Sequence, residues 1–431
     1  MLFGAFGVAA NTARTLAGWK EAVLIALLLG VALHAVFRRS GERALMSADF
    51  LAAALIAFAL LHAIAAEPIF SVGLPATAYL MGFRDAVFFI FVYFVGRGAA
   101  GHVGLLVSRG HLVVIAVVTS LVAIVERIVV TPDMLVGLGV ASYFQEFLGV
   151  AEFTAGNEYG LPMNYWTDVG GVVIQRAGSV FLSGQGFAVP FLLLFPAVLV
   201  WALDRSDRRP RHYAAVALAF TGLLLTITRA TIIVALIQVI LYVTVKKRPE
   251  WAVLGLVAAA SAILITIVAF PSFGVFLWRT LTWQEASAAS HAAAWSSGVE
   301  AFFQRPWGWG LGTTDQTAVR AGLTPITGDN LYLKYAVEMG VIGLGLLVAL
   351  LFTLAATGYR LLSRARTANH RRLGLIVFLT TAGIAINGIP AAVFNSVPLA
   401  WLYFLVSGAA VTVWRDTAGE NTGAFATARS P

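Results

Sequence analysis

Long apolar runs alternate with short polar segments along the whole chain. Eleven of these runs cover residues 20–37, 48–66, 81–96, 111–130, 180–203, 212–228, 230–245, 251–270, 335–359, 373–390 and 396–414. A helix needs about 20 apolar residues, within a range of ~17–25, to cross the hydrocarbon core of a bilayer. The pattern therefore predicts an all-α polytopic membrane protein with about 11–12 transmembrane helices.

The two ends of the chain differ from these runs. We expect residues 1–18 to form an interfacial or re-entrant helix, with a twelfth span as the alternative, and we expect no removable signal peptide because a basic n-region and a cleavage site are lacking. Residues 416–431 are small and polar, which predicts a disordered cytoplasmic tail. Residues 1–415 are then a single transmembrane domain.

Composition agrees with this assignment and narrows the class of protein. The chain is 59% hydrophobic and 12% charged, whereas soluble proteins are about 45–50% apolar and ~25% charged. These values exclude a soluble enzyme, a disordered chain and a coiled coil. The absence of cysteine also excludes a disulfide framework and a thiolate metal site.

The net charge of +8 is best explained by membrane topology. Nineteen of the 29 lysines and arginines lie in six segments, at residues 38–43, 97–109, 205–211, 246–248, 360–372 and 415–429. These segments fall on every second loop, and cytoplasmic loops are the ones enriched in lysine and arginine. We therefore expect a bacterial inner-membrane protein with two long periplasmic loops, at about 130–178 and 271–334, the second partly helical. This distribution predicts no nucleic-acid partner.

Arg229 stands alone in a long apolar stretch between two basic segments. If both segments are cytoplasmic, residues 212–245 must cross the membrane twice, and Arg229 lies at the outward apex of a tight hairpin. A single long helix is the competing structure, and it would place the two segments on opposite sides. An arginine at membrane depth is costly and usually faces a cavity or a partner; the alternative is an arginine that snorkels to the interface.

The first outward loop is acidic, and Arg176 is its only cation near the following span. The segment RAGSVFLSGQGF, which starts at Arg176, is rich in small residues that allow close backbone approach or a broken helix. Arg176 is therefore a candidate substrate ligand. The alternative is a surface ion pair with a loop carboxylate.

The second outward loop holds the remaining candidates. HAAAWSSGVEAFFQ, starting at His291, has the spacing of an amphipathic helix, which could also simply rest on the membrane surface. Pro306 is expected to end that helix at RPWGWGLGTT. The glycines of this segment permit tight turns. The segment is not a phosphate-binding loop, because the lysine followed by serine or threonine that such a loop requires is absent. The structural-turn residues are Pro306, Gly308, Gly310 and Gly312.

Asp329 and Asn330 stand at the start of the next span. Asp329 is a candidate base. The alternative is that Asp329 is a helix N-cap or a first-turn acid, which interacts favourably with the positive end of the helix dipole. Lys334 is one turn further on, where it could pair with Asp329. None of the seven histidines has the spacing of a paired metal site, and no GXSXG motif is present.

Taken in order, TRATI, HAAAWSSGVEAFFQRPWGWGLG and DNLYLKYAVEMGVIG resemble the O-antigen ligase and O-antigen polymerase superfamily. The resemblance is sharpest over residues 220–350 and extends faintly to Arg176. It implies an integral-membrane, inverting glycosyltransferase whose donor is a glycan on undecaprenyl diphosphate. It implies no metal or nucleotide cofactor, because the diphosphate is the leaving group. The acceptor is lipid A core for ligases, a second lipid-linked glycan for polymerases, or a protein hydroxyl for related oligosaccharyltransferases.

The resemblance also suggests roles for individual residues. Arg229 matches the family's arginine at the corresponding loop. Two positions depart from the ligase pattern: His291 stands where ligases commonly have arginine, and Asp329–Asn330 replaces a His-Asn pair. We expect Asp329 and Arg229 to be catalytic, and the expected diphosphate and substrate contacts are Arg176, Arg229, His291, Asn330, Tyr332 and Arg305.

Asp-Asn at this place favours a repeat-unit polymerase over a ligase. A transporter or flippase of lipid-linked sugars is the hypothesis from another class, because intramembrane charges also mark transport paths. Many transporters show repeated halves, which this sequence lacks. A non-catalytic scaffold would leave Arg229 unexplained.

Overall fold

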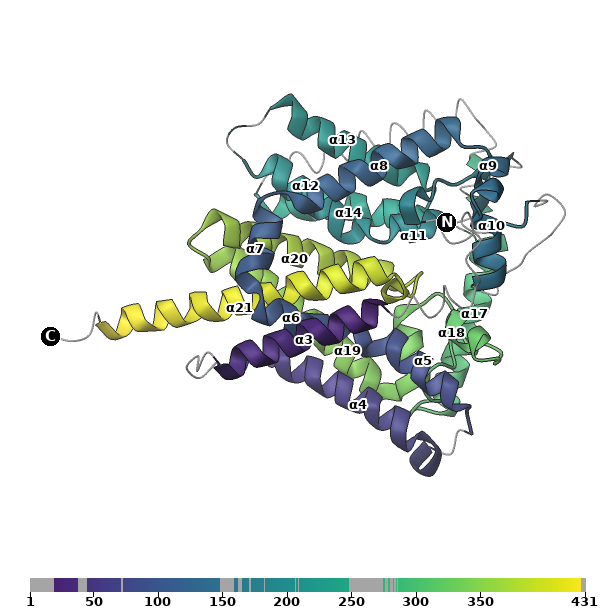
Figure 1. The fold of residues 1–431 in the computed structure, drawn as a ribbon, viewed down its shortest axis with the longest axis horizontal. Coiled ribbons are helices and arrows are strands. Elements are labelled where there is room, and N and C mark those ends of the chain that lie inside the picture. The colour runs from purple at the N-terminus through teal and green to yellow at the C-terminus, as the bar shows by residue number, and fades with distance from the viewer. Residues whose placement is uncertain are drawn as a thin grey trace.

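A computed structural model describes residues 19–37, 45–70, 73–147, 159–161, 165–169, 172–181, 183–205, 207, 209–247, 274–275, 278–279, 282, 284 and 286–427. These residues form a bundle of helices (Figure 1). The membrane-type helices before the first long loop are α3 (Trp19–Phe37), α4 (Ser47–Phe70), α5 (Ala76–Val87), η1 (Phe88–Ile90), α6 (Phe91–Gly98), α7 (Ala100–Ser108) and α8 (His111–Val129). Those after it are η4 (Ser179–Phe181), α11 (Gly184–Ala188), α12 (Phe191–Leu203), α13 (Pro210–Leu225), α14 (Arg229–Val245), α19 (Leu331–Arg364), α20 (Ala368–Asn387), η5 (Val393–Asn395) and α21 (Val397–Thr427).

The predicted fold class is confirmed. Ten of the eleven predicted spans coincide with these helices; the span at 251–270 and residues 1–18 lie outside the described residues. Within the described part of the chain, six helical stretches are long and apolar enough to cross a membrane. Helix α14 is also apolar but is shorter, at 17 residues.

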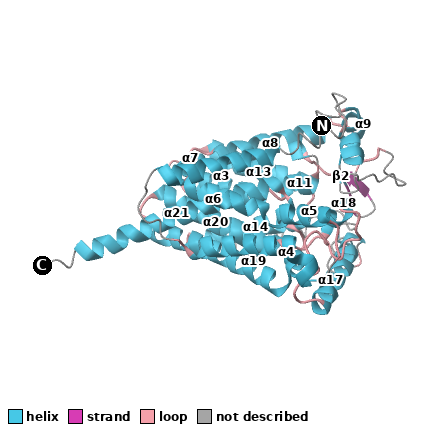
Figure 2. Ribbon diagram, turned by 60° about the horizontal axis from the view of Figure 1, so that its bottom comes forward, coloured by secondary structure: helices cyan, strands magenta, loops and turns pink. Residues whose placement is uncertain are grey.

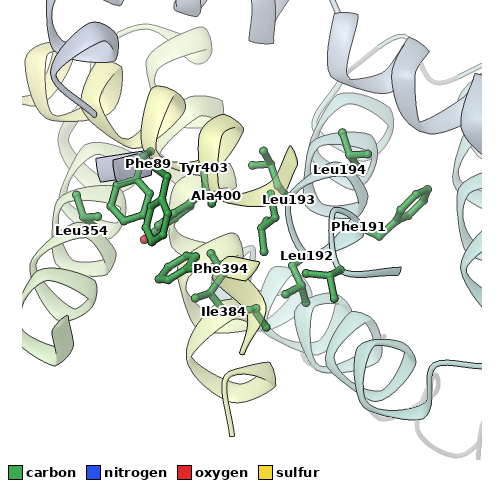
Figure 3. Packing of buried hydrophobic residues seen from close by; sticks show 14 of the residues in the cluster. Phe89, Phe191, Leu192, Leu193, Leu194, Leu354, Ile384, Phe394, Ala400 and Tyr403 are labelled. Atoms are coloured by element: carbon green, nitrogen blue, oxygen red, sulfur yellow. The ribbon is translucent and has the colours of Figure 1, made fainter. Parts of the chain in front are cut away.

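Helix α12 occupies the centre of the bundle. It is apolar on every side, which is the pattern of a helix surrounded by protein, and it packs against α8, α13, α14 and α20. Figure 3 shows its residues Leu192 and Leu193 beside Ile384 of α20. The buried side chain of Gln238 on α14 donates to the carbonyls of Leu192 (2.9 Å) and Leu379 (3.1 Å), which ties α12, α14 and α20 together.

Several of the basic segments meet at one end of the bundle. Asp204, just after α12, accepts hydrogen bonds from Lys246 at the end of α14 and from the Nε of Arg372 on α20, at 3.2 Å. Lys246 and Arg372 come from two of the segments that the sequence predicted to be cytoplasmic, and Asp204 directly precedes a third. Their meeting is the arrangement that alternating membrane crossings require.

The elements of the two long loops gather at the other end (Figure 2). The first loop contributes α9 (Pro132–Gly137), α10 (Val140–Ser142), the π-helical η2 (Tyr143–Phe147) and an antiparallel hairpin of β1 (Trp166–Val169) and β2 (Val172–Gln175), with Trp166 opposite Gln175. The second loop contributes α17 (Ala286–Gln304) and α18 (Asp315–Arg320), so it is partly helical, as predicted.

Helix α21 extends beyond the bundle at the C-terminal end (Figure 1). The sequence predicted a disordered segment from Asp416 onward, whereas the helix continues to Thr427. Extending an existing helix by one residue costs little, because nucleation has already been achieved. Local composition therefore does not mark the helix end here.

Candidate active site

The segment around Arg229 forms two helices joined by a tight turn. Helix α13 ends at Leu225 and α14 begins at Arg229, with Ile227 between them in the left-handed region at φ 51°. The hairpin interpretation is confirmed, and a single long helix is excluded. Arg229 lies at the first position of α14, directly after the turn.

Arg176 binds the same turn. It follows β2, and its Nε donates to the carbonyl of Thr226 at 2.8 Å while Nη2 donates to the hydroxyl of Thr228 at 2.7 Å. Gly184 makes this contact possible, because a Cβ there would lie 2.8 Å from the Arg176 Nε. The turn that precedes Arg229 is therefore built around the Arg176 guanidinium.

Two guanidinium groups consequently lie close together. Burial of the Arg176 side chain and the nearby charge of Arg229 lower the pKa of Arg176 to about 10. Both effects disfavour a charged group, and a bound anion would relieve both. Arginine binds phosphate oxygens in a bidentate fashion, so this pair suits a phosphate or diphosphate ligand.

Glu126 supports this pair, and sequence reasoning missed it. It lies in the last turn of α8, is 8% exposed, and accepts the backbone N–H groups of Gly178 (3.2 Å) and Ser179 (2.5 Å). Ser179 has φ 51°, and its hydroxyl donates to the carbonyl of Thr119 at 2.7 Å. The loop just after Arg176 is thus fixed to α8. The only sequence signal was an acidic residue at the end of an apolar run.

His291 and Asp329 form the second group, with 4.0 Å between His291 Nδ1 and Asp329 Oδ2. Helix α17 positions His291 because the hydroxyl of Thr327 donates to the carbonyl of Ala294 at 2.8 Å. A Cβ at Gly298 would lie 2.7 Å from the Thr327 hydroxyl, so glycine is needed for this close packing. The amphipathic helix predicted from His291 is confirmed, and it ends at Gln304, just before Pro306.

Asn330, and not Asp329, caps helix α19. The Asn330 side chain accepts the N–H of Leu333 at 2.9 Å. Asp329 precedes the cap with φ 50°, and its backbone N–H donates to Asp315 Oδ1 at 3.0 Å. The capping interpretation of Asp329 is therefore wrong, and its carboxylate is directed toward His291 instead.

Lys334 pairs with Asp315 and not with Asp329. Its Nζ lies 3.3 Å from Asp315 Oδ2 and donates to Asn395 Oδ1 at 3.1 Å, and the side chains of Lys334 and Asp315 are 2% and 6% exposed. The expectation failed because Asp329 lies outside the helix, where the spacing rule for helical pairs does not apply. Asp315 thus joins Asp329, Lys334 and Asn395 in one hydrogen-bonded network around the buried Lys334–Asp315 pair.

The glycine-rich segment fills a break in α19. Gly340 adopts φ 66° and ψ −164°, which interrupts the helical hydrogen bonds. The carbonyls of Val337 and Glu338 instead accept the N–H groups of Trp309 (2.7 Å) and Gly310 (3.1 Å). The predicted turn residues Gly308, Gly310 and Gly312 all have positive φ. The turn therefore joins the second loop to a membrane helix through backbone hydrogen bonds.

Two predicted substrate ligands have protein contacts of their own. The Arg305 guanidinium lies 5.1 Å from the centre of the Trp309 ring, a cation–π geometry. The Tyr332 hydroxyl donates to the carbonyl of Ala385 at 2.6 Å, so the ring faces α20. For these residues a role in substrate binding stays a prediction.

The two groups lie at the same end of the bundle. Thr231, two residues after Arg229, accepts a hydrogen bond from Asn387 Nδ2 at 3.4 Å. The carbonyl of the next residue, Gly388, accepts the N–H of Leu331 at 2.8 Å. The start of α14, the end of α20 and the start of α19 therefore meet, which brings Arg229 and Asp329 to one region.

The electrostatic setting suits a base at Asp329. Displacement of water by the surrounding protein raises the pKa of Asp329, His291 lowers it, and the charge of Asp315 raises it further. The side chain is 60% exposed, so solvent screening limits the rise. Within the described residues, no three His, Asp or Glu side chains come together as a metal ion would require.

A comparison with protein families finds a match for the region that contains most of the site residues. Residues 214–348 match the family model described as O-antigen ligase. This stretch is similar to the O-antigen ligase family. The resemblance read from the sequence over residues 220–350 is confirmed. No curated protein matches the chain.

The matched stretch, residues 214–348, holds every predicted site residue except Arg176. Arg229 lies near its start, and Asp329 and Asn330 lie near its end. Arg176 joins the site from outside this stretch through its bonds to Thr226 and Thr228. One arginine of the cationic pair, Arg176, therefore lies outside the residues that the family match covers.

Proposed function

We propose that this protein is an inverting, metal-independent glycosyltransferase that moves a glycan from undecaprenyl diphosphate to a sugar hydroxyl of a second lipid-linked glycan. It would thus act as a repeat-unit polymerase of O-antigen or a similar polysaccharide. The observation that carries the proposal is the cationic pair of Arg176 and Arg229 at the same end of the bundle as the His291–Asp329 pair. The similarity to the O-antigen ligase family supports the reaction class.

In this mechanism the arginine pair holds the leaving group. Negative charge grows on the diphosphate as the bond from the anomeric carbon to the phosphate oxygen breaks. Fixed donors aimed at that charge stabilise the transition state, and they act most strongly where water is excluded. Arg176 is already oriented by the turn before Arg229, so little reorganisation is needed when the donor binds.

Asp329 is the proposed base. The acceptor hydroxyl attacks the anomeric carbon on the face opposite the diphosphate, which inverts the configuration, and its proton passes to the Asp329 carboxylate. A pKa above the ordinary aspartate value makes Asp329 a better proton acceptor at neutral pH. His291, 4.0 Å from Asp329, is placed to contact the sugar or a phosphate oxygen.

A ligase is the second candidate, and the description of the matched family as O-antigen ligase favours it. The chemistry would be the same, with lipid A core as the acceptor. A protein hydroxyl is a further acceptor for the same machinery. The Asp329–Asn330 pair, in place of the His-Asn pair of ligases, supports the polymerase.

The proposed setting is a bacterial inner membrane with the site facing the periplasm. The clustering of Arg372, Lys246 and other cations at the opposite end supports this orientation. A flippase for lipid-linked sugars would instead need charged residues along a path between the two ends. The gathering of candidate residues at one end supports the enzyme.

The primary test replaces Arg229 with alanine in a complemented deletion strain. We expect loss of polymer at normal protein level, with Arg320→Ala as the matched control, because Arg320 is an exposed arginine at the end of α18, in the second long loop. Unchanged polymer amount and length in Arg229→Ala would remove this arginine from the mechanism. Full activity of Asp329→Asn would exclude Asp329 as the base.

The acceptor is decided by what the deletion strain accumulates. A polymerase deletion leaves single repeats on the final acceptor, whereas a ligase deletion leaves finished polymer on the carrier lipid. Glycan transfer by purified protein in liposomes without any ion gradient would distinguish the enzyme from a transporter.

A further inference from the structure

A small cleft opens at the basic end of the bundle, opposite the candidate active site. It lies between α7, α12 and α20 and opens to solvent. Arg205, Asn369 and Arg372 line its mouth, and Val107, Ala197 and Ile376 line its wall. The cleft is therefore cationic where it opens and apolar where it runs along the helices.

The two arginines are held in place by neighbouring groups. Arg372 donates through Nε to Asp204 Oδ2 (3.2 Å) and through Nη1 to Asn369 Oδ1 (3.5 Å). Its Nη2 donates to the Asp204 carbonyl at 2.5 Å. Arg205 lies 5.9 Å from the centre of the Trp201 ring, and its Nε donates to Asp207 Oδ1 at 3.0 Å. These contacts orient both guanidinium groups at the mouth.

The charges around the mouth are not balanced. Among the residues that the structure describes, the cations Arg205, Arg372 and Lys246 face two carboxylates, Asp204 and Asp207. Asp204 is shared between Lys246 and Arg372. The mouth therefore keeps a positive excess that an anion can neutralise.

We propose that this cleft binds the phosphate of an anionic phospholipid. The phosphate would lie between Arg205 and Arg372, where it can accept strong charge-assisted hydrogen bonds from both guanidinium groups. The lipid's hydrocarbon chains would follow the apolar wall. Basic pockets between transmembrane helices on the cytoplasmic side are known binding places for such headgroups. Free phosphate shares the headgroup chemistry, but it would leave Val107 and Ile376 without a ligand contact.

The proposal is tested with the full-length protein in detergent, by native mass spectrometry after addition of cardiolipin, phosphatidylcholine or inorganic phosphate. We expect cardiolipin to be retained in preference to phosphatidylcholine. Arg205→Gln should weaken its retention by about tenfold or more, because a charge-assisted hydrogen bond is lost. Arg360→Gln is the matched control, since Arg360 is an exposed arginine outside the cleft, and it should retain cardiolipin as the wild type does.

A second variant keeps the test decisive if Arg205→Gln folds poorly. Asn369→Asp adds a negative charge at the mouth on an exposed side chain, and it should also weaken cardiolipin retention. Equal retention of cardiolipin and phosphatidylcholine would overturn the proposal. Equal losses of cardiolipin retention in Arg205→Gln and Arg360→Gln would also overturn it. Displacement of cardiolipin by inorganic phosphate at equal concentration would overturn it too, because it would indicate a site for free anions.

Discussion

Gly340 is a position at which a single added methyl group should damage the site. Its φ of 66° and ψ of −164° fall in a region that only glycine adopts readily, and a residue with a Cβ there costs about 1–3 kcal/mol. The methyl group would also lie 2.3 Å from the carbonyl oxygen of Pro306 and 2.4 Å from the carbonyl carbon of Trp307. Both atoms belong to backbone, so the turn must move.

That movement strains three backbone hydrogen bonds. They join Val341 to Pro306 (2.8 Å), Trp309 to Val337 (2.7 Å) and Gly310 to Glu338 (3.1 Å). Each contributes about 0.5–1.5 kcal/mol net. Together with the conformational strain, Gly340→Ala should cost roughly 2.5–7.5 kcal/mol if all three bonds are lost, a large fraction of the ~5–15 kcal/mol that stabilises a typical native protein.

The assay is thermal unfolding of purified protein in detergent, followed by tryptophan fluorescence. Gly345→Ala provides the matched control, because Gly345 lies on the same helix with no heavy atom within 4 Å of the new Cβ. Alanine there should leave the stability unchanged or raise it by up to ~1 kcal/mol. If Gly340→Ala unfolds at the same temperature as Gly345→Ala, the proposed joint between the loop and α19 is wrong.

Two further predictions concern the buried and titrating groups. Glycan transfer should slow as pH falls through the pKa of Asp329, because the protonated carboxyl cannot accept a proton. Since His291 lowers that pKa, His291→Gln should move the acid limb of the pH–rate profile to higher pH. A shift to lower pH would contradict this role of His291. Lys334→Met should destabilise the protein by about 3–5 kcal/mol, because Asp315 is then a buried charge without its cation. Thermal unfolding would measure this loss, and adding Asp315→Asn should recover part of it; a loss below ~1 kcal/mol would show that the pair is unimportant.

The features that depend on neighbouring residues in the sequence, such as helices, turns and helix ends, could be predicted from it. Ten of the predicted apolar runs coincide with described helices, and the basic segments flanking Arg229 required the hairpin that is observed. Pro306 ended the preceding helix as expected, because proline cannot continue it. The candidate residues Arg176, Arg229, His291 and Asp329 also followed from charge, spacing and family resemblance.

The partners of these residues could not be predicted, because they are distant in sequence. Glu126 reaches a loop more than fifty residues away, and Asp315 joins Asp329, Lys334 and Asn395 across separate elements. In sequence, Glu126 looks like an interfacial acid and Asp315 like a surface residue. The glycine-rich turn was predicted as a turn, but its purpose depends on the break at Gly340, which only the structure reveals.

The length of α14 has a consequence for the surrounding lipid. Its 17 residues rise by about 25 Å, whereas the hydrocarbon core of a bilayer is ~30 Å thick. Arg229 and Lys246, at its two ends, are therefore closer together than the two headgroup layers. Thinning of the adjacent bilayer is one way in which hydrophobic mismatch of this kind is accommodated. A diphosphate held at Arg229 would then meet a locally thin membrane, and transfer should respond to the acyl-chain length of the host lipid.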